Sequence, residues 1–411
     1  MAWITTGRVT LALLATALAL AYGIWYAYSV ILVALLAEFG WERSVLAGAF
    51  SLFAIVHGCT NPFIGHLCDR VRPALIMAVG GTGLGCALFA NSLIQQPWHL
   101  YLYFGGFTAI SVAMCGWAPA VVQVQHRFSH RLGFALGIVS SGIGVGMLLL
   151  VPLCQWLIEA FGWRMAFRVL GVICTGFVVP AAIYLYRSDP GPARRAIARR
   201  DEGKTDTDIT LRQAAATTPF WLVILTFFFG STCSQMLHVH QVAFLVDHGI
   251  AALTAASVVG LVGVASVFGK TGGGWLSDRI EREIVYVSGI FILVLSVGLI
   301  MLAGSSQSVV VAYIYAVALG VGYSATAAII PAMVSDRYPG RHFGTILGMG
   351  LFGSAAGSAL GPWMGGYLFD ITGAYTIPFA IAVLFGIGAS AAGWTLRRLR
   401  LGRGPAVRVA A

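Results

Sequence analysis

Long apolar stretches, separated by short polar segments, make up most of this chain. Each stretch is long enough to cross a bilayer, because a helix of about 20 apolar residues spans the hydrocarbon core. None of them shows the alternation typical of a strand, so we predict an all-α membrane protein with twelve transmembrane helices. The stretches lie roughly at 9–37, 45–66, 73–95, 98–125, 132–159, 163–186, 217–246, 252–276, 284–305, 307–335, 342–369 and 374–396.

Two short motifs occur twice in the chain at nearly the same offset. Residues 65–70 and 274–279 both read G-x-L-x-D-R, and their aspartates are 209 positions apart. Residues 127–131 and 337–341 both begin and end with arginine, and they are 210 positions apart. The chain is therefore predicted to contain two copies of one membrane unit, arranged as two pseudo-symmetric six-helix bundles.

This repeat divides the chain into four regions. The first apolar stretch is too long for a signal-peptide core and lacks a convincing cleavage site, so we interpret it as a retained helix. The predicted regions are an N-terminal six-helix bundle at 1–186, a cytoplasmic linker at 187–216, a C-terminal six-helix bundle at 217–396 and a basic cytoplasmic tail at 397–411.

Composition and charge support a membrane setting. The chain is 58% hydrophobic and only 10% charged, so lipid must solvate much of its surface. The net charge of +10 is unevenly distributed, because 21 of the 25 lysines and arginines fall in the termini and in the loops on the same side. This asymmetry predicts a multi-pass protein of the inner (plasma) membrane with both termini inside, and it argues against a nucleic-acid partner.

Cysteine and glycine usage indicates helix packing. The seven cysteines lie mostly within the predicted spans and form no C-x-x-C pair, so we expect buried, reduced thiols, with no metal and no cofactor. Small residues four positions apart let helix backbones approach closely in lipid. Such faces could serve packing alone, or could slide when the two halves move; they comprise Gly142 and Gly146, and Gly353, Gly357, Gly361 and Gly365.

The doubled G-x-L-x-D-R motif resembles the signature of the major facilitator superfamily, and the resemblance extends over the whole chain. Within that superfamily the chain looks most like the monocarboxylate and oxalate/formate-type carriers. Residues 38–43, E-F-G-W-x-R, and residues 240–249, H-x-x-x-F-L-x-D-x-G, are similar to patterns found there. The chain departs from that pattern at three positions: Lys270 replaces a usual arginine, Ser266 an aspartate of the animal members, and Val30 a lysine.

The resemblance implies a cytoplasmic gate built from the two motifs. Asp69 should lie at the start of the eleventh helix and Asp278 at the start of the fifth, where the helix dipole favours a carboxylate. Arg341 and Arg131 would supply partners, although the same bonds could form a static staple of the loops. The predicted gate comprises Gly65, Asp69, Arg70, Arg131, Gly274, Asp278, Arg279 and Arg341.

Lys270 is the candidate that carries the chemistry. It lies eight residues before Asp278, which places it roughly 12 Å inside the membrane edge. On a helix it shares a small, polar face with Ser266, and the spans hold no mid-membrane Asp or Glu to neutralise it. A substrate carboxylate is the natural partner; the alternatives are snorkelling toward the cytoplasm and a bond to a backbone carbonyl.

The remaining site candidates are aromatic, amide and imidazole side chains. His57 and His240 join Lys270 as candidate proton carriers, although each could be a packing histidine. His238 and His240 point about 200° apart on a regular helix, so they cannot hold one metal ion together. In relatives, helices 1, 4, 7 and 10 line the cavity. With Lys270 and Ser266, the candidate substrate contacts are therefore Tyr22, Trp25, Tyr26, Trp117, Gln123, His238, His240, Gln241 and Tyr323.

These features predict a secondary active transporter that moves a small monocarboxylate by alternating access. We expect it to work as a monomer in the lipid bilayer on a small organic anion, with protons as candidate coupling ions. A multidrug or other small-molecule antiporter of the same fold, and a non-transporting receptor, are the alternatives. We do not expect an enzyme, because the chain shows no carboxylate pair, metal-ligand motif or serine-histidine-aspartate set.

Overall fold

The structure is a computed structural model that describes residues 2–127, 132–187, 209–277, 279–338 and 343–401. All regular structure within these ranges is helical. The first six membrane segments are α1 (Ala2–Phe39), α2 (Arg43–Arg70), α3 (Pro73–Asn91), a composite fourth segment, α7 (Leu132–Phe161) and α8 (Trp163–Arg187). After the short α10 (Leu211–Ala215) come α11 (Thr218–Asp247), α12 (Ala252–Ser277), α13 (Arg282–Ser306), α14 (Val309–Arg337), α15 (Phe343–Thr372) and α16 (Thr376–Leu401).

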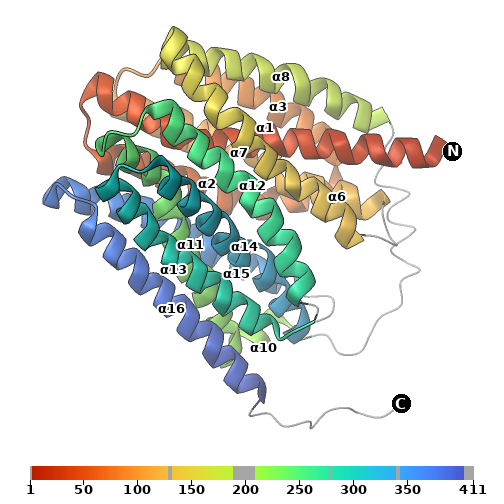
Figure 1. Cartoon of the computed structure of the whole chain (residues 1–411). Coiled ribbons are helices and arrows are strands. Elements are labelled where there is room, and N and C mark those ends of the chain that lie inside the picture. Colours follow the sequence, from red (N-terminus) through yellow and green to blue (C-terminus); the bar gives the residue numbers. More distant parts are fainter. Residues whose placement is uncertain (1, 128–131, 188–208, 278, 339–342, 402–411) are drawn as a thin grey trace, which may run out of the picture.

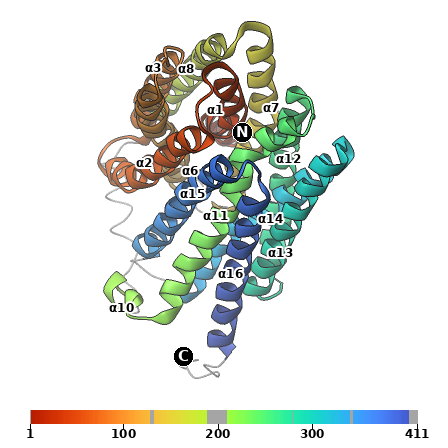
Figure 2. The same ribbon diagram turned by 90° about the vertical axis from the view of Figure 1, so that its left-hand side faces the viewer.

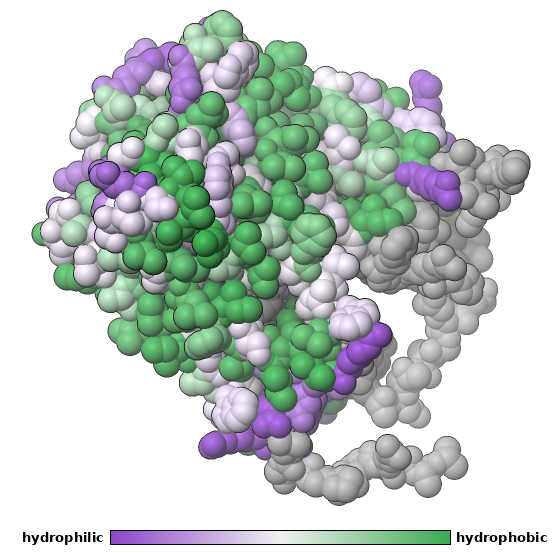
Figure 3. Space-filling view, viewed as in Figure 1, coloured by the Kyte–Doolittle hydropathy of each residue, from purple (hydrophilic) through white to green (hydrophobic). Residues whose placement is uncertain are grey.

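Twelve helical segments therefore match the twelve predicted spans, and an all-α membrane architecture is confirmed. Among the described residues, ten helices are long and apolar enough to cross a membrane by length and composition. The helices α14 and α15 complete the twelve. Green, apolar side chains cover the middle of the face shown in Figure 3, with purple, polar ones gathered toward its ends.

The fourth membrane segment is broken, although the sequence predicted one continuous helix. It consists of α4 (Pro97–Leu100), the π-helical segment η1 (Tyr101–Thr108), α5 (Ala109–Cys115) and α6 (Trp117–Arg127). The break falls at Gly116, whose φ of −92° and ψ of −140° leave the helical region. The ring of Tyr22 from α1 packs beside Gly116, so the break lies close to the first helix.

Glycines end four of the long helices at one end of the molecule. Gly40, Gly162, Gly249 and Gly373 follow α1, α7, α11 and α15, each with a φ between +63° and +86°. Only glycine adopts this left-handed conformation without strain, which is why it closes helices so often. We call this end the Arg43 end, and the opposite end, where α2 and α12 finish in the G-x-L-x-D-R motifs, the motif end.

The helices form two groups of six membrane segments, which Figures 1 and 2 show one above the other. The spaced glycines pack within each group rather than between groups. Gly142 and Gly146 of α7 face the backbone carbonyls of Ala15 and Ala19 in α1. In the same way, Gly357 and Gly361 of α15 face the carbonyls of Phe228 and Thr232 in α11. A larger residue at these glycines would force the paired backbones apart.

The two groups meet mainly along two helix pairs, α2 with α15 and α7 with α12, and to a smaller extent between α1 and α11. Gly58 packs on Ala355 in the first pair, and Gly144 on Gly263 in the second. Beyond these contacts the groups separate toward the motif end: Phe63 of α2 is 74% exposed, and the space around Gly65 is open. Figure 1 shows the helices converging at the Arg43 end and spreading toward the end that carries both termini.

Candidate functional site

Seven of the predicted site residues lie together where the two helix groups meet. We call them the central cluster. Tyr26 of α1 contacts His238 of α11 across the two groups, with ring centroids 5.2 Å apart. In the first group, the rings of Tyr22, Trp25 and His57 contact one another beside Tyr26, and in the second group the ring of Tyr323 contacts both His238 and Lys270. The central cluster consists of Tyr22, Trp25, Tyr26 and His57 from the first group, and His238, Lys270 and Tyr323 from the second.

Lys270 lies inside the helix bundle and not against lipid. Its ammonium Nζ is 5.3 Å from the centroid of the Tyr323 ring and 3.4 Å from the Tyr323 hydroxyl. The opposite, lipid-facing side of α12 carries Phe268, which is 71% exposed, and Trp275, which is 59% exposed. Among the described residues, no carboxylate forms an ion pair with Lys270. The ammonium therefore keeps donor capacity for a group that is not part of the described protein.

His238 of α11 is buried, with only 3% of its surface exposed. Its ring packs edge-on against Tyr323, with centroids 4.8 Å apart. The Nδ1 atom is 2.7 Å from the backbone carbonyl oxygen of Ser234, one helical turn earlier. The Nε2 atom is buried and has no hydrogen-bond partner among the described residues. A buried polar atom without a partner marks a place where a ligand or water is expected.

The first helix group contributes unpartnered polar atoms of the same kind. The Nε1 atom of Trp25 and the Nε2 atom of His57 are buried, and the described residues offer neither a partner. Their rings pack edge-on, with centroids 4.9 Å apart. Phe53 stacks on His57 with ring centroids 6.1 Å apart, and it also packs edge-on against Trp25 at 4.8 Å. The central cluster therefore combines apolar ring surface with a few polar atoms, a composition typical of small-molecule sites.

Equivalent positions in the two helix groups carry different chemistry. Asn61 and Lys270 each lie eight residues before the aspartate of their own motif, and His57 and Ser266 each lie twelve residues before it. The side-chain amide of Asn61 donates to the carbonyl oxygen of His57 at 2.9 Å, so it is used within α2. Only the second group therefore places a cation at this position.

The other predicted contact residues have partners elsewhere. Ser266 donates to the carbonyl of Gly263 at 2.8 Å within its own helix. Gln241 accepts from the Tyr315 hydroxyl at 3.0 Å, and the amide of Gln123 lies 2.9 Å from the sulfur of Met77. Trp117 is partly buried at the start of α6, directly after the break at Gly116. The structure thus places these residues in helix packing around the central cluster.

Half of the eight predicted gate residues lie wholly or partly outside the described part of the chain. This applies to Arg131, Asp278 and Arg341, and to the side chain of Asp69. Arg70 is exposed at the end of α2, and the guanidinium carbon of Arg279 lies 3.5 Å from the centroid of the Trp275 ring. A Cβ at Gly65 or at Gly274 would meet nothing within 4 Å, as expected where the helix groups are apart.

Charged contacts join the two helix groups at the Arg43 end. The guanidinium of Arg43 pairs with Asp247 of α11 at 2.7 Å, and it lies over the ring of Phe369 at 4.1 Å. The carboxylate of Asp370 accepts the backbone N–H groups of Arg43 and Ser44, at 3.0 and 2.7 Å. Because α2 has no cap of its own at Glu42, an aspartate of the other group caps this helix.

His240 belongs to this same network rather than to the central cluster. Arg43 donates to the Tyr375 hydroxyl at 2.7 Å, and that hydroxyl lies 3.0 Å from Nδ1 of His240. Burial raises the pKa of Tyr375 well above its ordinary value, so the hydroxyl keeps its proton and can donate to His240. The other nitrogen, Nε2, is 2.8 Å from the carbonyl oxygen of Pro362.

We call Arg43, Asp247, Asp370, Tyr375 and His240 the Arg43 network. The sequence analysis missed the role of its first four members, although two of them stand in the family-like stretches 38–43 and 240–249. These stretches meet in space through the ion pair of Arg43 with Asp247. Two acidic residues, Asp247 in the last turn of α11 and Asp370 near the end of α15, were the sequence features that could have indicated this network.

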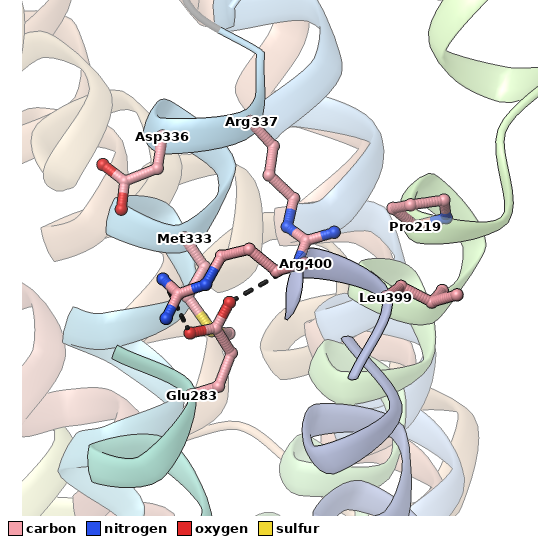
Figure 4. Close-up of a pocket in the computed structure, with 7 residues that line it drawn as sticks. All are labelled: Pro219, Glu283, Met333, Asp336, Arg337, Leu399 and Arg400. Carbon is pink, nitrogen blue, oxygen red and sulfur yellow. Dashed lines mark hydrogen bonds and ion pairs between the residues drawn. The ribbon is translucent and has the colours of Figure 1, made fainter. Parts of the chain in front are cut away.

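A cavity of about 290 Å³ lies at the motif end of the second helix group (Figure 4). Glu283, at its centre, is 3% exposed and pairs with Arg400 at 3.2 Å and with Arg337 at 3.4 Å. Arg337 also donates to the carbonyl of Leu396 at 2.7 Å, which ties α14 to α16. These bonds hold the ends of α13, α14 and α16 together, and they lie apart from the central cluster.

The helical segments define a multi-pass membrane protein. A sequence model of the Major Facilitator Superfamily matches residues 14–317 and 242–408, and the chain belongs to that superfamily. Among curated relatives, rat "Monocarboxylate transporter 12" is 28% identical over 74% of this chain and 66% of its own length. Rat "Monocarboxylate transporter 13" is 26% identical over 90% of this chain and 84% of its own length.

A bacterial relative is also similar to this chain, and two solved structures share its fold. An uncharacterised MFS-type transporter of Bacillus subtilis is 22% identical over 85% of each chain. The crystal structure of a bacterial homologue of the human lysosomal transporter Spinster, inward-facing and occupied, matches with a TM-score of 0.76 at 18% identity, over 95% of this chain and 97% of that chain. Its unoccupied form matches with a TM-score of 0.74 at 16% identity, over 96% and 98%. These two structures support the fold alone.

Proposed function

We propose that the protein moves a small monocarboxylate across the membrane by alternating access. Lys270 carries this proposal, because it is a cation inside the bundle that no described carboxylate neutralises. A charge at this depth is costly in free energy, so a partner must offset it during the transport cycle. One fixed cation matches one negative charge on the substrate. The similarity to proteins named monocarboxylate transporters favours the same substrate class.

The central cluster would also select the remainder of the substrate. The rings of Tyr22, Trp25 and His57 form an apolar wall, and Tyr323 presents a hydroxyl beside the cation. A small organic acid has both an anionic end and an apolar end, so it suits this combination. A cationic drug would meet Lys270 with the wrong charge, which disfavours the multidrug alternative.

In the proposed cycle, the two helix groups rock about the central cluster. The structure corresponds to the state in which the Arg43 network closes one side while the groups are apart at the motif end. The charge asymmetry of the loops assigns the motif end to the cytoplasm. Opening of the Arg43 end would then require the Arg43 network to break. The doubled motif would close the cytoplasmic side in that second state.

Counterflow in proteoliposomes tests the proposal. Purified protein is reconstituted with unlabelled acid inside, and uptake of the same labelled acid is followed for formate, acetate, L-lactate, pyruvate and benzoate. We expect accumulation of at least one of these monocarboxylates, with weaker counterflow of the dicarboxylates oxalate and succinate. Lys270→Gln should lower this counterflow roughly 100-fold, because the substrate loses its only charge partner.

The other lysine of the chain provides a matched control, since the sequence contains only Lys204 and Lys270. Lys204→Gln makes the same chemical change in the predicted cytoplasmic linker and should leave counterflow at the wild-type level. Wild-type counterflow in Lys270→Gln, or accumulation of cationic dyes in place of acids, would overturn the assignment to monocarboxylates.

A further inference from the structure

We propose that the Nε2 atom of His238 carries the proton that accompanies the carboxylate, which makes transport electroneutral. This inference rests on the proposed function and adds the identity of the coupling group. Lys270 would hold the anion, and His238 would add a proton beside it. Both residues contact the ring of Tyr323, so they lie close to one another in the central cluster.

The hydrogen bond at Nδ1 fixes the tautomer of His238. The partner of Nδ1 is the backbone carbonyl oxygen of Ser234, at 2.7 Å, and a carbonyl can only accept. Nδ1 must therefore carry the hydrogen, and Nε2 of the neutral ring is a bare lone pair. This lone pair is buried and has no donor among the described residues. It can take up a proton without breaking any bond that the ring already makes.

Among the described side chains of the spans, the other two buried histidines lack this property. His240 donates from Nε2 to the carbonyl of Pro362, and its Nδ1 lies 3.0 Å from the Tyr375 hydroxyl. A proton on Nδ1 of His240 would turn this nitrogen from an acceptor into a donor, and the hydrogen bond from the Tyr375 hydroxyl would be lost. In His57, the Nδ1 atom lies 3.3 Å from the side-chain amide nitrogen of Asn61, which donates a hydrogen bond to it. Protonation of Nδ1 would break this bond. His238 is thus the ring with a vacant acceptor.

The groups around His238 determine when it can become charged. Tyr26 faces it from α1 and Tyr323 faces it from α14, and both are neutral phenols. Lys270 reaches the same Tyr323 from α12, and its positive charge opposes a second cation nearby. Among the described residues of α13, α15 and α16, no carboxylate pairs with the ring. A proton is therefore unfavourable on the empty site and becomes favourable once a carboxylate binds.

The coupled step follows from this charge balance. A carboxylate enters from the open side and one of its oxygens accepts from the ammonium of Lys270. A proton from the same solution adds to the lone pair of Nε2, and the new N–H group donates to the carboxylate. The anion and the proton together carry no net charge, so the loaded carrier can reorient without moving charge. On the other side both leave, and His238 returns to the neutral tautomer.

A histidine-to-asparagine substitution separates coupling from structure. The side-chain amide in His238→Asn can still donate to the Ser234 carbonyl, but it has no nitrogen that accepts a proton. For 14C-L-lactate, or whichever monocarboxylate shows counterflow, an inward proton gradient from about pH 5.5 to about pH 7.5 should stimulate wild-type uptake roughly tenfold. In the variant this ratio should fall to about one. Residual uptake should instead increase with an inside-positive potassium diffusion potential, because the anion now crosses alone.

His248 offers a control with the same local bond in the same helix. Its Nδ1 lies 2.7 Å from the carbonyl oxygen of Phe244, also one turn earlier, but it is at the Arg43 end and partly exposed. His248→Asn should retain the wild-type response to the proton gradient and remain insensitive to the potential. If His238→Asn does not fold, His238→Gln, which places an amide near the position of Nε2, takes its place with the same two measurements.

The outcomes distinguish this inference from the proposed function. A wild-type protein without counterflow of any monocarboxylate contradicts both. Wild-type counterflow that ignores the proton gradient overturns the role of His238 and leaves the substrate assignment intact. A His238 variant that still responds to the gradient, or gains no dependence on the potential, also overturns it.

Discussion

The two helix groups share one packing scheme and differ in what they present at the centre. In both groups, glycines on the fifth segment face backbone carbonyls on the first: Gly146 faces Ala19 in one, and Gly361 faces Thr232 in the other. At equivalent positions near the centre, the first group has Asn61 and the second has Lys270. The repeated unit therefore supplies the framework, and a few unmatched residues supply the chemistry.

This difference has a physical basis. Two identical halves would place two cations at the centre, where each would raise the free energy of the other in a medium of low dielectric. In the first half, the side-chain amide of Asn61 instead donates to the backbone carbonyl oxygen of His57 in the same helix, at 2.9 Å. The asymmetry leaves one positive charge at the centre, which matches the single negative charge of the proposed substrate.

The largest expected effect comes from exchanging these two residues. Lys270→Asn alone should lower uptake roughly 100-fold, and Asn61→Lys added to it should not restore transport. The cation would then face the aromatic rings of the first group, away from Tyr323 and His238. Uptake of the labelled acid into proteoliposomes measures both variants. Asn61→Ala is the control and should retain uptake within about threefold. Recovery in the double variant would show that the halves are interchangeable at this position.

The shared packing scheme predicts equal losses of stability in the two halves. A Cβ added at Gly146 or at Gly361 meets a backbone carbonyl that cannot move aside cheaply. Gly146→Ala and Gly361→Ala should each lower the free energy of unfolding by about 2 kcal/mol. Thermal unfolding in detergent measures the change. Gly298→Ala is the matched control, because no atom lies within 4 Å of that Cβ. A loss of stability in only one of these two variants would contradict the same packing scheme in both halves.

A smaller effect is expected at the contact between the halves. Arg43→Gln removes the charge that pairs with Asp247, so the closed Arg43 end loses stability and uptake falls roughly tenfold. Hydrogen exchange should show faster exchange at the start of α2. Arg164→Gln breaks the ion pair with Glu38 at 2.6 Å, which lies within the first half alone, and should change neither measurement. Equal effects of the two variants would contradict a special role for the contact between halves.

The smallest effect concerns a charge pair confined to the second half. Arg397, bonded to Glu281 at 2.5 Å, lowers the pKa of that carboxyl below its ordinary value. The resulting stability is present at neutral pH and is lost as the pH falls through the lowered pKa. Glu281→Gln should therefore lower the melting temperature slightly at neutral pH, and the difference should narrow below about pH 4. A difference that grows in acid would contradict this assignment.

The sequence predicted the helices and the inward position of Lys270 because both follow from local patterns. Apolar length defines a span, and the distance from Asp278 determines depth. The Arg43 network could not be predicted in this way, because Arg43 and Tyr375 are 332 positions apart and their contact depends on how the halves meet. The break at Gly116 was missed because a single glycine in an apolar stretch rarely ends a helix, and nothing local marked this one as different.

The side chain of Asp370 completes a helix to which it does not belong. In the proposed cycle, its two bonds to the first turn of α2 would exist only while the Arg43 end is closed. Each time the Arg43 end opened, the backbone N–H groups of Arg43 and Ser44 would lose their hydrogen bonds to the Asp370 carboxylate and would donate to water instead. The amide hydrogens of Arg43 and Ser44 are consequently a native reporter of which side the carrier faces, readable by deuterium labelling without any introduced probe.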